Sequence, residues 1–142
     1  MILPDVNVLV YAFREEAAHH TRYREWLLAR VAGREAFALS ELVLSGALRI
    51  LTHPRVLDPP TPLDRALEFV EALRLQPNAV LLSPGPRHWD IFTNLCKAAG
   101  ARGNLVADAY HAALAIEHGC EWISTDRDYT RFPGLKWRHP LD

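Results

Sequence analysis

Four acidic residues fall where the sequence predicts that a strand gives way to a helix, or within the first turns of a helix. Asp5 follows a short apolar run, Glu41 opens a helical pattern, Asp108 lies early in the most strongly patterned helix, and Asp126 follows another apolar run. In a parallel sheet, strand ends and the starts of the following helices share one edge, so Asp5, Glu41 and Asp126 are expected on the same side. Asp108 joins them if its helix points there.

A cluster of carboxylates requires a cation. Two unit charges 4 Å apart repel by about 4 kcal/mol at an effective dielectric near 20. Asp108 shares a smooth apolar helix face and has no Lys or Arg one turn away, so its compensating charge must come from elsewhere. Oxygen ligands without His or Cys suit Mg²⁺ or Mn²⁺, which often meet phosphate in their open positions. The pattern therefore indicates phosphoester chemistry.

Each acid also has a simpler structural role. Asp5 and Asp126 suit turns or helix N-caps, and Glu41 beside Ser40 suits a helix dipole. Taken one at a time, the cap role is about as good an explanation as a ligand role. Only the four acids together favour a metal site.

Composition limits the class of protein. The 142 residues fit one domain, residues 1–142, large enough to bury roughly 68–70% of its unfolded surface. Lys and Arg number 16 against 17 acids, so no basic stripe indicates nucleic acid or a membrane surface, and an RNA partner is neither indicated nor excluded. Cys96 and Cys120 lack metal-ligand spacing and are expected to be reduced core residues. Without a signal-like start or 18 consecutive apolar residues, a cytoplasmic protein with no membrane partner is expected.

Periodicity and caps predict the elements that must position the acids. Helices are expected at Asp5–Phe13, His20–Val31, Ser40 to about His53, Pro62 through Leu73, Trp89–Ala99 and Asn104–His118. Strands are expected in the run before Asp5 and at Arg34–Leu39, Asn78–Leu82, Glu121–Ser124 and, more weakly, Leu135–Arg138. Strands separated by helices predict an α/β fold, a three-layer sandwich whose short, mainly parallel central sheet of four to five strands is flanked by helices.

Five segments together resemble one family. They are Asp5-Val-Asn-Val-Leu-Val-Tyr, Ser40-Glu-Leu-Val-Leu-Ser-Gly with Thr52-His-Pro-Arg, Asp108-Ala-Tyr-His-Ala-Ala-Leu-Ala-Ile-Glu-His-Gly, and Ser124-Thr-Asp-Arg-Asp-Tyr. Each motif is weak alone, but their order and separation span essentially the whole chain. In this respect the sequence resembles PIN-domain proteins, specifically the VapC-type toxins of prokaryotic toxin–antitoxin pairs.

The resemblance implies a Mg²⁺-dependent endoribonuclease toxin of a type II toxin–antitoxin system, in which Mn²⁺ can substitute. It implies that Asp5, Glu41, Asp108 and Asp126 form a catalytic quartet holding a metal-activated water, with Asp5, Asp108 and Asp126 as metal ligands. One or two ions would bind.

Residues around the quartet follow from the same resemblance. Asn7 and Thr125 are expected to support the acids through hydrogen bonds, and Asp128 shares or replaces the role of Asp126. Where the family pattern usually has Phe, this chain has Tyr129, a change expected not to affect catalysis.

Substrate contacts are harder to assign. Arg55, Arg102 and Arg127 flank the expected site in sequence and are candidates to bind RNA phosphates, although exposed arginines without such a role are about twice as common an explanation. His111, one turn past Asp108, can reach a phosphate or order a carboxylate, but a helix-face His is more often packed or solvated.

The expected partners are RNA, a cognate antitoxin and a second copy in a homodimer. Tyr23, Trp26 and Phe69 lie at helical spacing beside a proline-rich loop, where they pack in the core or form a groove for the antitoxin. Two other functions are alternatives to a ribonuclease toxin. A haloacid-dehalogenase-type phosphotransferase would have an Asp where Asn7 stands. A catalytically silent PIN-like RNA- or protein-binding module is the stronger alternative, since a fold does not guarantee activity.

Overall fold

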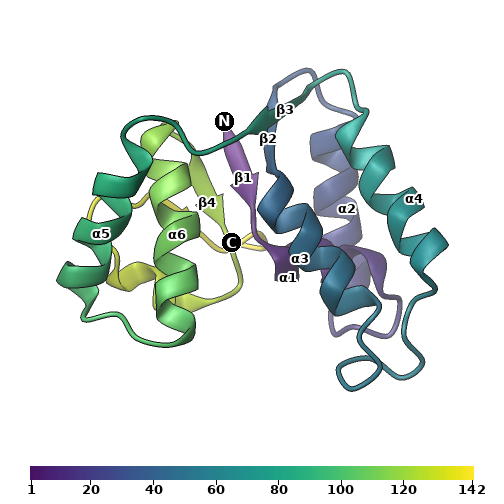
Figure 1. Ribbon diagram of the computed structural model, residues 1–142. Helices are drawn as coiled ribbons and strands as arrows, with labels where there is room; N and C mark the ends of the chain where they lie inside the picture. Colours follow the sequence, from purple (N-terminus) through teal and green to yellow (C-terminus); the bar gives the residue numbers. More distant parts are fainter.

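Five short strands form the centre of the molecule, all with parallel pairings, in a computed structural model that describes residues 1–142 (Figure 1). They are β1 (Ile2–Pro4), β2 (Phe37–Ser40), β3 (Ala79–Leu82), β4 (Glu121–Ile123) and β5 (Trp137–Arg138). Strand pairing joins β1, β4 and β5 in one group and β2 and β3 in another. Strand β2 lies beside β1, which gives the spatial order β3-β2-β1-β4-β5. The predicted parallel sheet is confirmed, although no ladder of backbone bonds joins β1 to β2.

Six α-helices and one short 3₁₀ helix connect the strands. They are α1 (Val6–Phe13), α2 (His20–Val31), α3 (Glu41–Leu51), α4 (Leu63–Arg74), α5 (His88–Ala99), α6 (Asn104–Glu117) and the 3₁₀ helix η1 (Arg127–Arg131). Helices α5 and α6 pack together on one side of the strands, and α1 to α4 lie on the other (Figure 1). This is the three-layer α/β arrangement that the sequence predicts.

The boundaries differ from the prediction mainly at helix starts. Helix α6 begins at Asn104 as predicted, and its N-cap is Gly103, whose φ of 61° is a backbone conformation that favours glycine. Pro62 is the N-cap of α4 rather than a residue inside its first turn. Strand β2 begins at Phe37, three residues later than expected, because Arg34, Glu35 and Ala36 are exposed and unpaired.

One main hydrophobic core joins both helical layers through the strands. Leu3, Leu39 and Trp122 are almost fully buried in it, and α6 contributes a row of buried alanines. Both cysteines are free thiols, with Cys120 buried and Cys96 half-buried. None of the helices is both long enough and apolar enough to cross a membrane.

Candidate metal centre

Asp5 lies at the carboxyl end of β1 and is the N-cap of α1. Its backbone N–H donates to the Ile123 carbonyl at 2.8 Å, which extends the β1–β4 pairing by one residue. Its carboxylate Oδ1 accepts a hydrogen bond from the Val6 N–H at 2.7 Å, and the residue is only 7% exposed. The cap role and a role in the site are therefore compatible, since only one carboxylate oxygen serves the cap.

Ser124 connects Asp5 to Asp126. Its fully buried hydroxyl donates to Asp5 Oδ2 at 2.6 Å and accepts from the backbone N–H of Asp126 at 3.0 Å. The sequence prediction gave this supporting role to Thr125, which is half-buried and whose side chain makes no hydrogen bond here. The signal that identifies Ser124 is local, because a Ser two residues before an Asp is the pattern of a turn closed by its hydroxyl.

Asp108 lies in the early turns of α6 and is half-buried. The Tyr129 hydroxyl donates to Asp108 Oδ1 at 3.3 Å, and Tyr129 itself is only 2% exposed. Burial raises the pKa of Asp108, and the charges of Asp126 and Asp128 raise it further, while the Tyr129 hydrogen bond opposes these effects. Tyr129, which the sequence prediction treated as a neutral replacement for Phe, is thus in direct contact with one of the acids.

Asp126 caps the 3₁₀ helix η1. Its Oδ1 accepts the backbone N–H of Asp128 at 2.8 Å, as an N-cap side chain does. The charge of Asp126 acts on both Asp5 and Asp108, whereas Asp128 is exposed and acts on Asp108. Of the two acids between which the sequence does not choose, Asp126 is the one whose charge acts on both of the other carboxylates.

Burial and neighbouring negative charges both act on Asp5. Its pKa is raised to about 6, first because the carboxylate is buried, and in smaller part because Asp108 and Asp126 are negative. Hydrogen bonds from Ser124 and Val6 lower the pKa without cancelling these effects. Asp5 after β1, Asp108 in α6 and Asp126 after β4 are thus close enough for their charges to interact. The topology predicts this edge of the sheet for Asp5 and Asp126, and the direction of α6 adds Asp108.

Glu41 is the exception. It begins α3 at the same edge, but its side chain is 68% exposed and its carboxylate lies 3.7 Å from the Arg74 guanidinium of α4. It is not among the charges that shift the pKa of Asp5 or Asp108. The structure brings three of the four predicted acids together and leaves Glu41 outside that group.

The donor set suits a divalent cation, although the side chains must close around it. No three acidic, His or Cys side chains already stand in a metal-binding group. The carboxylates are nevertheless the oxygen donors that hard ions prefer. Asn7, two residues past Asp5, has a buried Oδ1 without a hydrogen-bond partner. An unpaired buried acceptor of this kind costs free energy that a cation or its water would recover.

The four candidate phosphate-binding residues lie in different environments. Arg55, Arg102 and Arg127 are exposed, and the Arg127 guanidinium lies 5.9 Å from the Trp137 ring centroid. His111 is packed at 5.3 Å on the Trp122 ring, its Nδ1 is buried without a partner, and burial lowers its pKa to about 4. His111 is therefore neutral near pH 7 and offers no positive charge to a phosphate.

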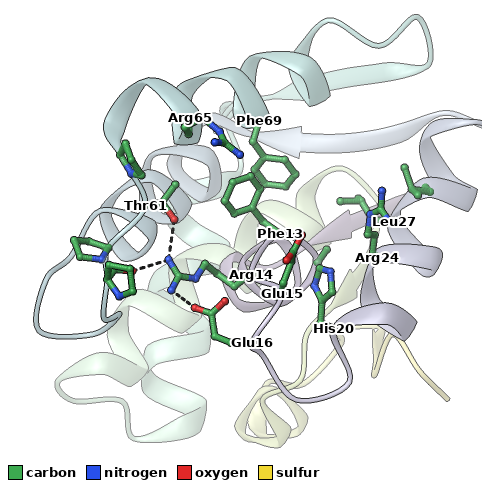
Figure 2. Close-up of a pocket in the computed structure, with 15 residues that line it drawn as sticks. Phe13, Arg14, Glu15, Glu16, His20, Arg24, Leu27, Thr61, Arg65 and Phe69 are labelled. Atoms are coloured by element: carbon green, nitrogen blue, oxygen red, sulfur yellow. Dashed lines mark hydrogen bonds and ion pairs between the residues drawn. The ribbon is translucent and has the colours of Figure 1, made fainter.

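A pocket lies at the other end of α1 (Figure 2). This pocket, of about 650 Å³, lies between α1, α2, α4 and the proline loop at residues 59–62, and Phe13 and Phe69 meet in it with ring centroids 4.7 Å apart. Arg14 donates from Nη1 to the Pro59 carbonyl at 2.9 Å and to Thr61 Oγ1 at 3.1 Å, and also pairs with Glu16. We call this region the α1–α2–α4 pocket.

The three aromatic residues singled out in the sequence separate here. Phe69 lines the α1–α2–α4 pocket, whereas Tyr23 is buried against Tyr11 with ring centroids 5.2 Å apart. Trp26 is half-buried beneath Arg30. Core packing accounts for Tyr23, and only Phe69 faces the pocket.

Comparison with known proteins agrees with this geometry. The PIN domain family model matches residues 2–135. The chain is 46% identical over 143 residues to VapC ribonuclease Mb2897 of Mycobacterium bovis, covering 100% of this chain and 97% of the relative. It is 39% identical to Ribonuclease VapC25 of Mycobacterium tuberculosis, covering 99% of each.

Solved structures share the fold at lower identity. VapBC2 from Rickettsia felis, bound to a promoter DNA fragment, has a TM-score of 0.72 at 17% identity and covers 98% of both chains. VapC20 of Mycobacterium tuberculosis, described as a toxin that cleaves the sarcin-ricin loop, has a TM-score of 0.68 at 16% identity and covers 96% of this chain and 99% of that one. Because the family model spans nearly the whole chain and full-length relatives exceed a third identity, this protein belongs to the PIN-domain family, among the VapC ribonucleases.

Proposed function

We propose that this protein is a divalent-metal-dependent endoribonuclease, the toxin of a type II toxin–antitoxin pair, and that Mg²⁺ is its metal, replaceable by Mn²⁺. The observation that carries the proposal is the convergence of Asp5, Asp108 and Asp126: the charges of Asp108 and Asp126 add to the burial that raises the pKa of Asp5, the charge of Asp126 does the same at Asp108, and no Lys or Arg compensates them. Curated relatives named as VapC ribonucleases support the choice of RNA as substrate.

In this proposal Asp5, Asp108 and Asp126 hold the metal. A divalent ion bound there would lower the pKa of water and offset charge on the phosphate. Ser124 keeps one oxygen of Asp5 fixed, and the bond from the Asp128 N–H to Asp126 Oδ1 fixes that carboxylate. These two carboxylates therefore have defined orientations before metal arrives, and closing around the ion is left mainly to the remaining side chains.

Glu41 stays in the proposed catalytic set through a change of side-chain conformation. Its pair with Arg74 is solvent-exposed at 3.7 Å, and such pairs contribute about 0–1 kcal/mol. Leaving Arg74 costs little, so Glu41 can turn toward the other acids when metal or RNA binds. Arg55, Arg102 and Arg127 remain candidates for RNA phosphates because they are exposed, while Asn7 and Asp128 are proposed to support the metal ligands.

The α1–α2–α4 pocket is the proposed seat of the antitoxin. It combines the paired rings of Phe13 and Phe69 with Arg24 and Arg65, a surface suited to a partner segment with apolar and acidic side chains. Several structural neighbours are toxin–antitoxin complexes, such as VapBC-1 from nontypeable Haemophilus influenzae. A homodimer is proposed as well, on the family resemblance alone.

Incubation of the purified chain with total RNA tests the activity. We expect cleavage with Mg²⁺ or Mn²⁺, none with EDTA, and none from an Asp108→Asn variant in either metal. Mapping the cut ends then identifies the RNA. Cleavage that survives EDTA and the Asp108→Asn change would contradict the proposed site.

Thermal melting distinguishes an enzyme from a silent PIN-like module. Metal that binds only the folded protein stabilises it by about 2.7 kcal/mol at a hundred times its dissociation constant. We expect Mn²⁺ to raise the melting temperature of the native chain and to have a smaller effect on Asp108→Asn. A chain that melts identically with and without metal would favour the silent module.

A further inference from the structure

Tyr129 connects two of the acid-bearing elements. It lies in η1, three residues after Asp126, and its hydroxyl reaches Asp108 Oδ1 on α6 at 3.3 Å. Asp126 is the N-cap of η1, so one hydrogen bond joins the segment that carries Asp126 to the helix that carries Asp108. This bond therefore holds the segment that carries Asp126 against the helix that carries Asp108.

The Tyr129 ring packs against two other aromatic rings. It packs on Trp122 with ring centroids 5.3 Å apart and on Phe132 at 5.9 Å, and Trp122 is fully buried in the core. A side chain with this packing has no free rotation to reach another partner. Its hydroxyl therefore stays directed at Asp108.

The hydroxyl meets a carboxylate oxygen. Because an ionised carboxylate accepts hydrogen bonds and donates none, the Tyr129 hydroxyl is the donor in its contact with Asp108 Oδ1. It therefore supplies the acid group with a hydrogen-bond donor that carries no charge of its own.

We propose that Tyr129 is a positioning residue whose hydroxyl holds Asp108 by Oδ1, leaves the other carboxylate oxygen for the divalent ion, and sets the separation between Asp108 and Asp126. This proposal rests on the proposed metal site. Groups that orient metal ligands typically change metal affinity or activity about 10–100-fold when removed. A Phe at position 129 keeps the ring packing and loses only this bond.

The test is Tyr129→Phe, with Tyr23→Phe as the matched control, because Tyr23 is also a buried tyrosine packed on aromatic neighbours but lies away from the acids. Direct binding of Mn²⁺ is measured by calorimetry for the native chain and both variants. We expect Tyr129→Phe to weaken Mn²⁺ binding at least about tenfold and Tyr23→Phe to leave it unchanged.

Cleavage of RNA across a Mn²⁺ titration gives the second measurement. Tyr129→Phe should need more metal for half-maximal cleavage and regain most of its rate at saturation. Unchanged Mn²⁺ affinity in Tyr129→Phe, with melting lowered equally in the presence and absence of metal, would assign Tyr129 a packing role only and overturn the proposal. A native chain that binds Mn²⁺ but cuts no RNA would instead refute the proposed function and leave the role of Tyr129 to be decided by the binding data.

Discussion

The two ends of α1 differ in how their charges are balanced. The helix spans eight residues, roughly 12 Å, with Asp5 at its N-terminal cap and Arg14 at its C-terminal cap. At the first end, buried Asp5 faces Asp108 and Asp126, and its pKa is raised to about 6. At the second, buried Arg14 is paired with Glu16, Thr61 and the Pro59 carbonyl.

The difference indicates what each end needs from outside. Arg14 is paired within the chain, so its role is to shape the α1–α2–α4 pocket, while Arg24 and Arg65 remain available to a partner. The acid end has no such balance, and its remaining charge requires a cation that the chain does not supply. One short helix thus separates a surface suited to a partner from a site suited to a metal.

Replacing Asp108 should have the largest effect at the acid end of α1 and none at the Arg14 end. Asp108→Asn takes one ligand from the metal, and because a bound metal contributes several kcal/mol to catalysis, we expect cleavage to fall at least about a thousandfold. Binding of the antitoxin at the other end of α1 should be unchanged. Cleavage rate and antitoxin affinity, measured on the same preparation, check both statements, and near-native cleavage would remove Asp108 from the mechanism.

Asp5→Asn should sharpen the contrast in the metal-free protein. The folded-state pKa of Asp5, about 6, lies above its ordinary 3.8, so the folded chain binds more protons between these values and loses stability as pH rises through 6. At neutral pH the penalty is on the order of 3 kcal/mol. Asn keeps the cap without the charge.

Urea unfolding at pH 5 and pH 7 in EDTA measures this effect. The contribution of Asp5 should make the native chain more stable at pH 5 than at pH 7. At pH 7 the Asp5→Asn variant should be more stable than the native chain, and it should cut no RNA. If Asp5→Asn leaves both the free energy of unfolding and its pH dependence unchanged, the raised pKa of Asp5 is contradicted.

A charge reversal in the α1–α2–α4 pocket should have the smallest of the three effects. Arg65 is exposed and lines the pocket, so Arg65→Glu should weaken binding of an acidic partner segment about tenfold, as expected for a charge at an interface rim. Cleavage by the free toxin should not change. Arg34→Glu, an exposed charge outside this pocket, is the control, and equal losses in both variants would mean that only net charge matters.

Much of this arrangement follows from the sequence. The bounds of α2 are predicted at both ends, because its apolar period is followed by Gly33. The meeting of Asp5 and Asp126 follows from parallel strands, whose carboxyl ends share one edge. Asp108 was inferred from an apolar helix face that lacked a counter-charge. These predictions depend on periodicity and topology, which a sequence carries directly.

Contacts that depend on which way one side chain faces are not predictable from the sequence. Ser124 rather than Thr125 faces Asp5 because of where β4 ends, and a shift of one residue there exchanges the two side chains. Tyr129 reaches Asp108 only because η1 turns it back toward α6. The pairing of Glu41 with Arg74 depends on a helix that begins 22 residues later.

The cap formed by Asp5 affects how an inactive form of this toxin should be made. Alanine at position 5 removes the acceptor for the Val6 N–H and for the buried Ser124 hydroxyl, and a lost cap alone costs about 1 kcal/mol. A cell that survives expression of such a variant would do so partly because less folded protein accumulates. Asparagine at position 5 keeps one carbonyl oxygen that can accept from the Val6 N–H and places an amide nitrogen where Ser124 now donates, whereas asparagine at position 108 leaves both Asp5 bonds intact. Survival with the Asp108→Asn variant therefore reports lost RNA cleavage rather than lost protein.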